Sequence, residues 1–234
     1  MAQLSQPQPP HIPLQSFPKI TRPTFLIDKA KCMSNLRKMK AKVDTANTLL
    51  QQQDRNKSKN NNNRSEGMSM IRFRPHCKTH ASIEVGRWMK EYVGITCITV
   101  SSLTMAQYFS TVFRDITVAF PVNILEMDTI NELITSTSTT AATTNTTNNH
   151  SNEDMKGPFQ LNLLVENVDA VQYLQTHLKG KVGIYIKIDV GYGRTGIPAQ
   201  NISNILQLVH AIVVDHDNNN IHNRLDFKGL LAHA

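Results

Sequence analysis

Five basic side chains lie within the nine residues of the segment RFRPHCKTH, residues 72–80. Side chains of an extended chain alternate between its two faces. An extended conformation would therefore place on a single face Arg74, His76, Lys78 and His80. A lysine amine beside other cations is more often uncharged, and an uncharged amine can form a Schiff base with an aldehyde. Lys78 is thus the candidate covalent anchor of this sequence.

The same segment also has a plainer interpretation. A basic strand end in contact with solvent has the same residue types and the same spacing. Pro75 removes a donor from the backbone ladder, so a strand through this segment must end, bulge or lie at a sheet edge there. Spacing alone leaves both interpretations open.

A glycine-rich segment, KIDVGYGRTGIP, matches the G-x-G-x-x-G pattern of dinucleotide-binding turns. Its glycines are Gly191, Gly193 and Gly196. Asp215 follows about twenty residues further on, where a ribose-binding carboxylate is expected. Against this interpretation, Pro198 is expected to start the next helix, whereas in a dinucleotide-binding fold the third glycine already lies in that helix. The alternative is a bare glycine-rich turn.

The third candidate is His233, in the segment GLLAHA at the end of a predicted buried strand. A single histidine in such a place is more often a core residue than a ligand or a catalyst. His233 therefore gains meaning only together with the two segments above.

Alternating strands and helices must position these residues. Nearly continuous runs of apolar, often β-branched residues, such as ITCITV and VGIYIKI, indicate strands buried on both faces of a parallel sheet. The expected strands are TFLID, SMIRFRPH, GITCITVS, DITVAFPV, FQLNLLVEN, KVGIYIKIDV and LDFKGLLAHA, and helical patterns lie between them. The alternation predicts an α/β fold, as an open doubly wound sheet or as a barrel of eight strand and helix units.

Three polar tracts interrupt the alternation. Residues 1–20, rich in Gln and Pro, are expected to form a disordered lead-in. The low-complexity tracts 51–66 and 135–154 are expected to be solvated loop insertions, because loop-closure entropy grows slowly with length. The rest of residues 21–234 ends on an apolar strand before eight units are complete, which predicts a partial barrel.

Composition narrows the classes of partner. The 234-residue chain has a net charge of +7, but its basic residues are scattered, with one cluster, LRKMKAK, which argues against nucleic-acid binding. No apolar run approaches the roughly 20 residues of a membrane helix, and the N-terminus has no signal-peptide core. A cytoplasmic protein without membrane contact is expected. The cysteines Cys32, Cys77 and Cys97 form no C-x-x-C pair, which disfavours disulfides and structural zinc.

The order of several segments resembles that of the D-serine dehydratase and D-threonine aldolase family. These segments are TRPTFLID, RPHCKTH, ITVSSLTMAQYF, DITVAFPV, IKIDVGYGRTGIP and FKGLLAHA, and R-P-H-x-K-T-H is the most specific motif. That family is similar in turn to the N-terminal barrel of alanine racemases, which are pyridoxal 5'-phosphate (PLP) enzymes. The resemblance implies a PLP-binding (β/α)8 barrel of the alanine racemase type from about Thr21 to Ala234.

The resemblance also implies roles for three residues. Lys78 would hold PLP as an internal aldimine and act as a base at the substrate α-carbon. Arg194 would hydrogen-bond the phenolic oxygen of the cofactor, and His233 would lie against its pyridine ring. The family carries a C-terminal β-domain with a metal site that this sequence lacks, so we expect no metal site and a barrel that is incomplete at its C-terminus.

These observations support three hypotheses of different classes. The first is a PLP-dependent lyase that acts on D-amino acids with a β-hydroxyl group and binds neither nucleic acid nor membrane. A homodimer is compatible with the family resemblance, since active sites of the family often involve a partner chain. The alternative is a catalytically inactive fragment or PLP-binding remnant, and the third is an NAD-dependent oxidoreductase. Sequence leaves open whether the first would be a dehydratase, an aldolase or a racemase.

Overall fold

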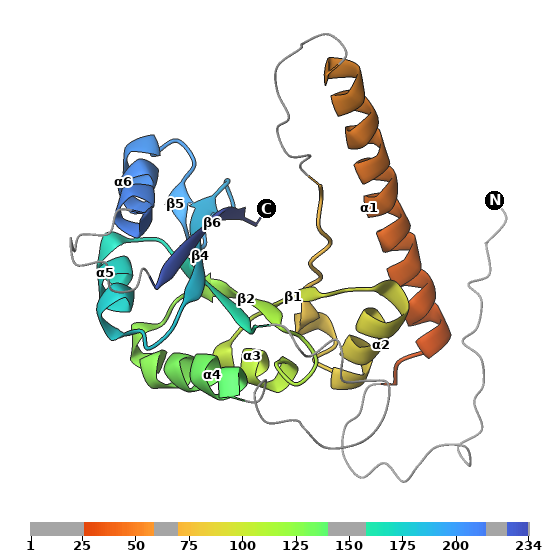
Figure 1. Ribbon diagram of the computed structural model, residues 1–234, viewed down its shortest axis with the longest axis horizontal. Helices are drawn as coiled ribbons and strands as arrows, with labels where there is room; N and C mark the ends of the chain where they lie inside the picture. The colour runs from red at the N-terminus through yellow and green to blue at the C-terminus, as the bar shows by residue number, and fades with distance from the viewer. Residues whose placement is uncertain (1–25, 59–69, 140–157, 214–223, 234) are drawn as a thin grey trace, which may run out of the picture.

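A computed structural model describes residues 26–58, 70–139, 158–213 and 224–233 (Figure 1). The predicted lead-in, residues 1–20, and Asp215 lie outside the described residues. Two predicted loop insertions begin as helix instead, because helix α1 (Lys29–Ser58) and helix α4 (Met127–Thr139) run into them. The rest of both tracts is not described.

The centre of the fold is a sheet of six strands that are all parallel. They are β1 (Cys97–Val100), β2 (Asp115–Pro121), β3 (Gln160–Val165), β4 (Val182–Asp189), β5 (Ile197–Pro198) and β6 (Leu225–Ala232). Strands β1 to β5 follow the order of the sequence across the sheet, and β6 pairs with β4. The predicted parallel α/β fold is confirmed, and within the described residues the sheet does not close into a barrel.

The helices lie on one side of the curved sheet, except that α1 packs on the helix that follows it and projects away from the sheet (Figure 1). Besides α1 and α4 they are α2 (Ile83–Val93), α3 (Leu103–Phe109), α5 (Val168–His177) and α6 (Ile202–Val213). Five of them follow a residue whose side chain accepts a hydrogen bond from an amide of the first turn, namely Asp28, Ser82, Ser102, Asn167 and Asn201. No helix in the described ranges is both long and apolar enough to cross a membrane.

The two faces of the sheet differ in polarity. The side chains that face the helices are apolar and almost fully buried, as for Ile98, Ile116, Leu161 and Ile184. The opposite, inner face carries the buried polar residues Thr117, Asn162 and Lys187. Thr117 on β2 pairs with Asn162 on β3, and Asn162 pairs with Gly183 on β4, so Thr117, Asn162 and Gly183 lie side by side across three strands. The helix side is therefore the apolar core, and the inner face is equipped for polar contacts.

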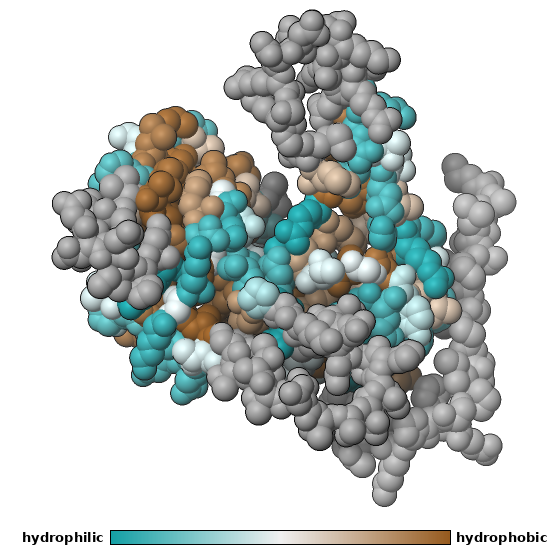
Figure 2. Space-filling view, viewed as in Figure 1, coloured by the Kyte–Doolittle hydropathy of each residue, from teal (hydrophilic) through white to brown (hydrophobic). Residues whose placement is uncertain are grey.

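Helix α6 has apolar residues on two faces. Ile205, Leu208 and Ile212 are buried towards the sheet and α5, as the amphipathic pattern requires. Ile202 and Leu206 are exposed on the outer face, where apolar surface is visible at the upper left of Figure 2. This face of α6 is part of the molecular surface in the described structure.

The segment before β1 departs from the predicted strands. Residues 26–28 and 70–75 form no regular strand, and one isolated bridge joins His76 to Thr99. Pro75 lacks an amide hydrogen, so it contributes its carbonyl alone, which accepts from the Thr99 amide at 2.9 Å. The predicted helix start at Pro198 is also wrong, because Pro198 pairs with Asp189 in β5 and α6 begins at Ile202.

Candidate active site

A cavity of about 320 Å³ opens on the inner side of the sheet, at the carboxyl ends of the strands. It is lined by Arg74, His76, Lys78, Thr99, Ala119, Phe120, Lys187, Tyr192, Arg194, Thr195, Leu231, Ala232 and His233. Parallel α/β folds hold their ligands at this edge. All three residues predicted from sequence, Lys78, Arg194 and His233, line this cavity although the chain separates them widely.

Lys78 is presented to the cavity by a single helical turn rather than by a strand. Residues Cys77–Thr79 form a 3-10 turn, and the Nδ1 atom of His76 accepts a hydrogen bond from the Lys78 amide at 3.2 Å. Cys77 is fully buried, and burial raises the pKa of its thiol to about 12. The buried side chain of Cys77 and the cap from His76 hold the turn at the two residues that precede Lys78.

The predicted alternation of basic side chains is correct up to Lys78 and wrong at His80. Because the chain turns at Cys77–Thr79, His80 does not line the cavity, and its ring packs edge-on against Phe109 with centroids 6.1 Å apart. His80 Nδ1 accepts from the Ser82 amide, and among the described residues its buried Nε2 has no hydrogen-bond partner. His80 therefore belongs to the packing beneath α2 and not to the site.

His76 is held in its neutral form at the cavity wall. Burial lowers the pKa of His76, and electrostatic interaction with Lys78 and His233 lowers it further. The hydrogen bond to Nδ1 requires the neutral ring to carry its proton on Nε2. A neutral His76 leaves one fewer positive charge beside the Lys78 amine.

The glycine-rich turn after β4 is held by two carboxylates. Asp189 Oδ1 accepts from the amides of Gly191 and Gly193, both at 3.0 Å, and these hydrogen bonds lower the pKa of Asp189. Glu166 Oε2 accepts from the Gly196 amide at 2.8 Å. The glycines have φ values of 110°, 67° and 107°, which other residues rarely adopt. Because the chain's own carboxylates take these amides, the turn differs from a dinucleotide-binding loop, whose amides face a phosphate.

This turn places two further side chains around the cavity. The Arg194 guanidinium lies 5.0 Å from the centre of the Phe120 ring, at the end of β2. Tyr192 contacts His233 edge-on, with ring centroids 5.7 Å apart. Aromatic contacts of these kinds orient charged and aromatic groups. Phe120 and Tyr192 were not predicted from the sequence, since nothing in the local pattern links them to residues on other elements.

Lys187 is a second amine in the cavity that the sequence analysis did not single out. It is 5% exposed, and burial lowers its pKa, an effect that the negative charges of Asp189 and Glu166 oppose. A charged residue within the otherwise apolar strand VGIYIKI is the signal that could have identified it. With Lys78 and Arg194 it makes the cavity wall strongly basic, and no carboxylate is among the described lining residues.

The side chains of this site fit PLP by their chemistry. The cavity offers an amine that can react with the aldehyde of PLP and cationic groups that can bind its phosphate or phenolate oxygens. It also offers aromatic rings that can pack against the pyridine ring. For metal ions the result is different, since no group of three His, Cys, Asp or Glu side chains in the described part of the chain could hold one. The site therefore suits an anionic organic group.

Comparison with known proteins agrees with this fold. No protein-family model matches the chain. The chain is 25% identical over 175 residues to D-serine dehydratase of Dictyostelium discoideum, a match that covers 70% of this chain and 38% of that protein.

Two solved structures share the fold. D-threo-3-hydroxyaspartate dehydratase of a Delftia species is 21% identical, with a TM-score of 0.58 and coverage of 88% of this chain and 42% of that one. An alanine racemase-like protein of Idiomarina loihiensis is 20% identical, with a TM-score of 0.58 and coverage of 89% and 42%. The chain thus spans about two fifths of the length of the proteins it matches. It is D-serine dehydratase-like in sequence and has the fold of the alanine racemase-like proteins.

Proposed function

We propose that this chain forms the cofactor-binding part of a PLP-dependent lyase that removes water from D-amino acids with a β-hydroxyl group. The observation that carries the proposal is the meeting of Lys78, Arg194 and His233 in one basic cavity at the carboxyl ends of parallel strands. The sequence match to a D-serine dehydratase supports the substrate class.

Each residue has a task in this proposal. Lys78 attaches the cofactor covalently through its amine and afterwards takes the proton from the substrate α-carbon. Arg194, oriented by Phe120, binds an anionic oxygen of the cofactor, and His233 with Tyr192 flanks the ring. When bound, PLP supplies an electron sink for the charge that the α-carbon gains. The net reaction of D-serine yields pyruvate and ammonia.

The first test is covalent labelling of the purified chain with PLP and borohydride, read by peptide mass spectrometry. We expect a pyridoxyl group on Lys78, its loss in Lys78→Ala, and its retention in Lys181→Ala, a control in which an exposed lysine outside the cavity is removed. An unlabelled wild-type chain would refute the proposal, as would equal labelling of the Lys78→Ala chain.

A second candidate function is binding of the cofactor without turnover. It is favoured by the open sheet, which does not surround the cavity within the described residues. Formation of pyruvate from D-serine by the chain loaded with PLP but not reduced distinguishes the two, because a binding protein would be labelled on Lys78 in a parallel borohydride experiment and release no pyruvate.

A further inference from the structure

The segment that carries Lys78 has few backbone bonds to the sheet. Between residues 70 and 76 the backbone pairing with β1 is the His76–Thr99 bridge, which includes the hydrogen bond from the Thr99 amide to the Pro75 carbonyl. The Cys97 thiol also donates to the Phe73 carbonyl, at 3.7 Å. A regular edge strand of this length would be joined by a continuous ladder. Something other than backbone pairing must hold this segment in register.

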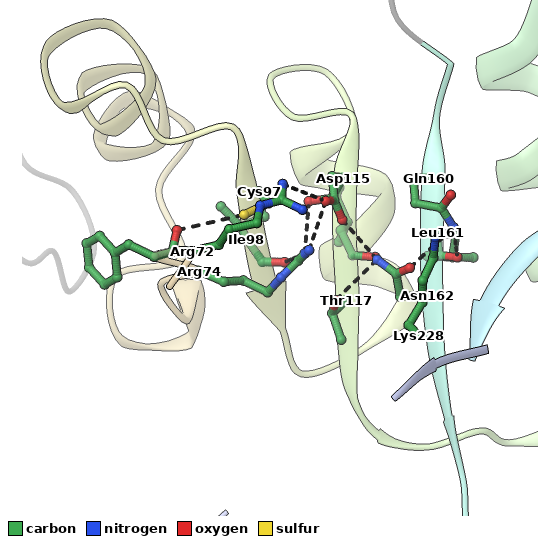
Figure 3. A network of polar contacts seen from close by, with 12 residues as sticks. Arg72, Arg74, Cys97, Ile98, Asp115, Thr117, Gln160, Leu161, Asn162 and Lys228 are labelled. Atoms are coloured by element: carbon green, nitrogen blue, oxygen red, sulfur yellow. Dashed lines mark hydrogen bonds and ion pairs between the residues drawn. The ribbon is translucent and has the colours of Figure 1, made fainter. Parts of the chain in front are cut away.

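Arg74 supplies side-chain bonds across two strands (Figure 3). Its Nη1 donates to the carbonyl of Ile98 at 3.2 Å and to the carbonyl of Asp115 at 3.4 Å. Its Nη2 donates to Asp115 Oδ2 at 2.8 Å. Burial opposes the charge of the Arg74 guanidinium, but the hydrogen bond and charge of Asp115 outweigh burial, so the pKa of Arg74 is raised. Arg74 therefore joins its own segment to β1 and β2 at once.

Asp115 is itself fixed from the other side. Asn162 Nδ2 donates to Asp115 Oδ1 at 2.9 Å, and Asn162 is almost fully buried on β3. Gln160 Nε2 donates in turn to Asn162 Oδ1 at 3.2 Å (Figure 3). The carboxylate that receives Arg74 is thus immobilised by the inner face of the sheet and not by solvent.

We infer that Arg74 is a positioning residue, whose bond to Asp115 holds residues 72–80 against the sheet and so directs Lys78 into the cavity. Arg74 lies four positions before Lys78 in the chain, and both line the cavity. The effect on Lys78 reactivity rests on the proposed function. The positioning of the segment by Arg74 does not, because it is a property of the chain without cofactor.

The chain offers a matched control in Arg72. Its Nη2 also lies near Asp115 Oδ2, at 3.5 Å, but its side chain is 66% exposed and does not line the cavity. Exposed ion pairs contribute little. Arg72→Met and Arg74→Met remove the same charge from the same carboxylate, and only the second removes the bonds to the strand carbonyls.

The first readout is amide hydrogen exchange of the segment 72–80 and of Thr99, without cofactor. In Arg74→Met we expect exchange faster by about tenfold or more, the factor for losing one hydrogen bond between charged groups, and no change in Arg72→Met. Peptides from β3 and β4 should exchange as in the wild type. Unchanged exchange in the segment would overturn the inference, whether or not PLP binds.

The second readout is the rate at which PLP and cyanoborohydride label Lys78. We expect labelling about tenfold slower in Arg74→Met, and a wild-type rate in Arg72→Met. Equal rates in wild type and Arg74→Met would make Arg74 merely structural and sink the inference. If Arg74→Met does not fold, Asp115→Asn, which keeps the side-chain size, must show the same two effects. If the wild-type chain takes up no label, the proposed function is refuted but the inference about Arg74 is not. That inference is then tested by the difference in amide hydrogen exchange between Arg74→Met and Arg72→Met.

Discussion

At the scale of single residues, the contact between Arg194 and Phe120 orients the guanidinium in the cavity. The guanidinium lies over the ring face, and Phe120 is 38% exposed at the cavity wall. A cation over an aromatic ring at such a site contributes about 0.5–1 kcal/mol. Phe120 thus restricts where Arg194 can meet an anion.

Replacement of that ring should weaken cofactor binding. For Phe120→Leu we expect a PLP dissociation constant raised roughly two- to fivefold, which corresponds to the energy of the lost contact. Phe120→Tyr keeps the aromatic face and should bind as the wild type does. An absorbance titration with PLP measures both, and equal affinity of the leucine and tyrosine variants would contradict the role given to the ring.

At the scale of elements, strands β3 and β4 fit together through one glycine. Gly183 faces Asn162 in the strand register, and a Cβ atom there would overlap Asn162 Oδ1 and lie 3.0 Å from Lys228 Cγ. Asn162 cannot move away easily, because it is bonded to Asp115 and buried. The absence of a side chain at position 183 leaves room for the polar network of the inner face.

A methyl group at this position should destabilise the sheet. We expect Gly183→Ala to lower the free energy of unfolding by about 1–3 kcal/mol, as for other overpacked cores. In Gly180→Ala the new Cβ meets the flexible end of Ile134, so this control should stay near the wild type. Urea denaturation compares the three chains, and a Gly183→Ala variant as stable as the control would show that β3 and β4 accommodate the methyl group.

Sequence patterns predict elements better than they predict connections between elements. The runs ITCITV and VGIYIKI contain strands β1 and β4, as their apolar β-branched residues indicate. The R-P-H-x-K-T-H segment is not a strand, since Pro75 breaks the ladder and the Arg74 side chain takes over its bonds. Lys78, Arg194 and His233 were predictable from their motifs. Their neighbours Phe120, Tyr192 and Lys187 were not, because they reach the cavity only through pairing of distant strands.

At the scale of the whole molecule, two histidines link stability to pH. Burial is the main cause that lowers the pKa of both His76 and His80 in the folded chain. The unfolded chain therefore binds more protons than the folded chain below the ordinary histidine pKa of about 6.5. The folded chain therefore keeps its full stability above that pH, where both histidines are neutral, and loses stability as the pH falls below it and protonation favours the unfolded chain.

The melting temperature should consequently fall between pH 7.5 and 5, a range set by the ordinary histidine pKa of about 6.5 and the lowered pKa values of the two rings. His80→Asn keeps an acceptor for the Ser82 amide but cannot titrate, so its melting temperature should fall less over this range. Thermal denaturation followed by circular dichroism checks this. Parallel curves for the two chains would mean that His80 does not contribute to the acid sensitivity.

The complete burial of Cys77, next to Lys78, has a chemical consequence for the cavity. Thiolates are strong nucleophiles and add to carbonyl carbons readily. With a pKa of about 12 the Cys77 thiol stays protonated at physiological pH, and its sulphur is shielded from the cavity. An electrophile that enters the cavity therefore encounters nitrogen nucleophiles without competition from the sulphur one residue away.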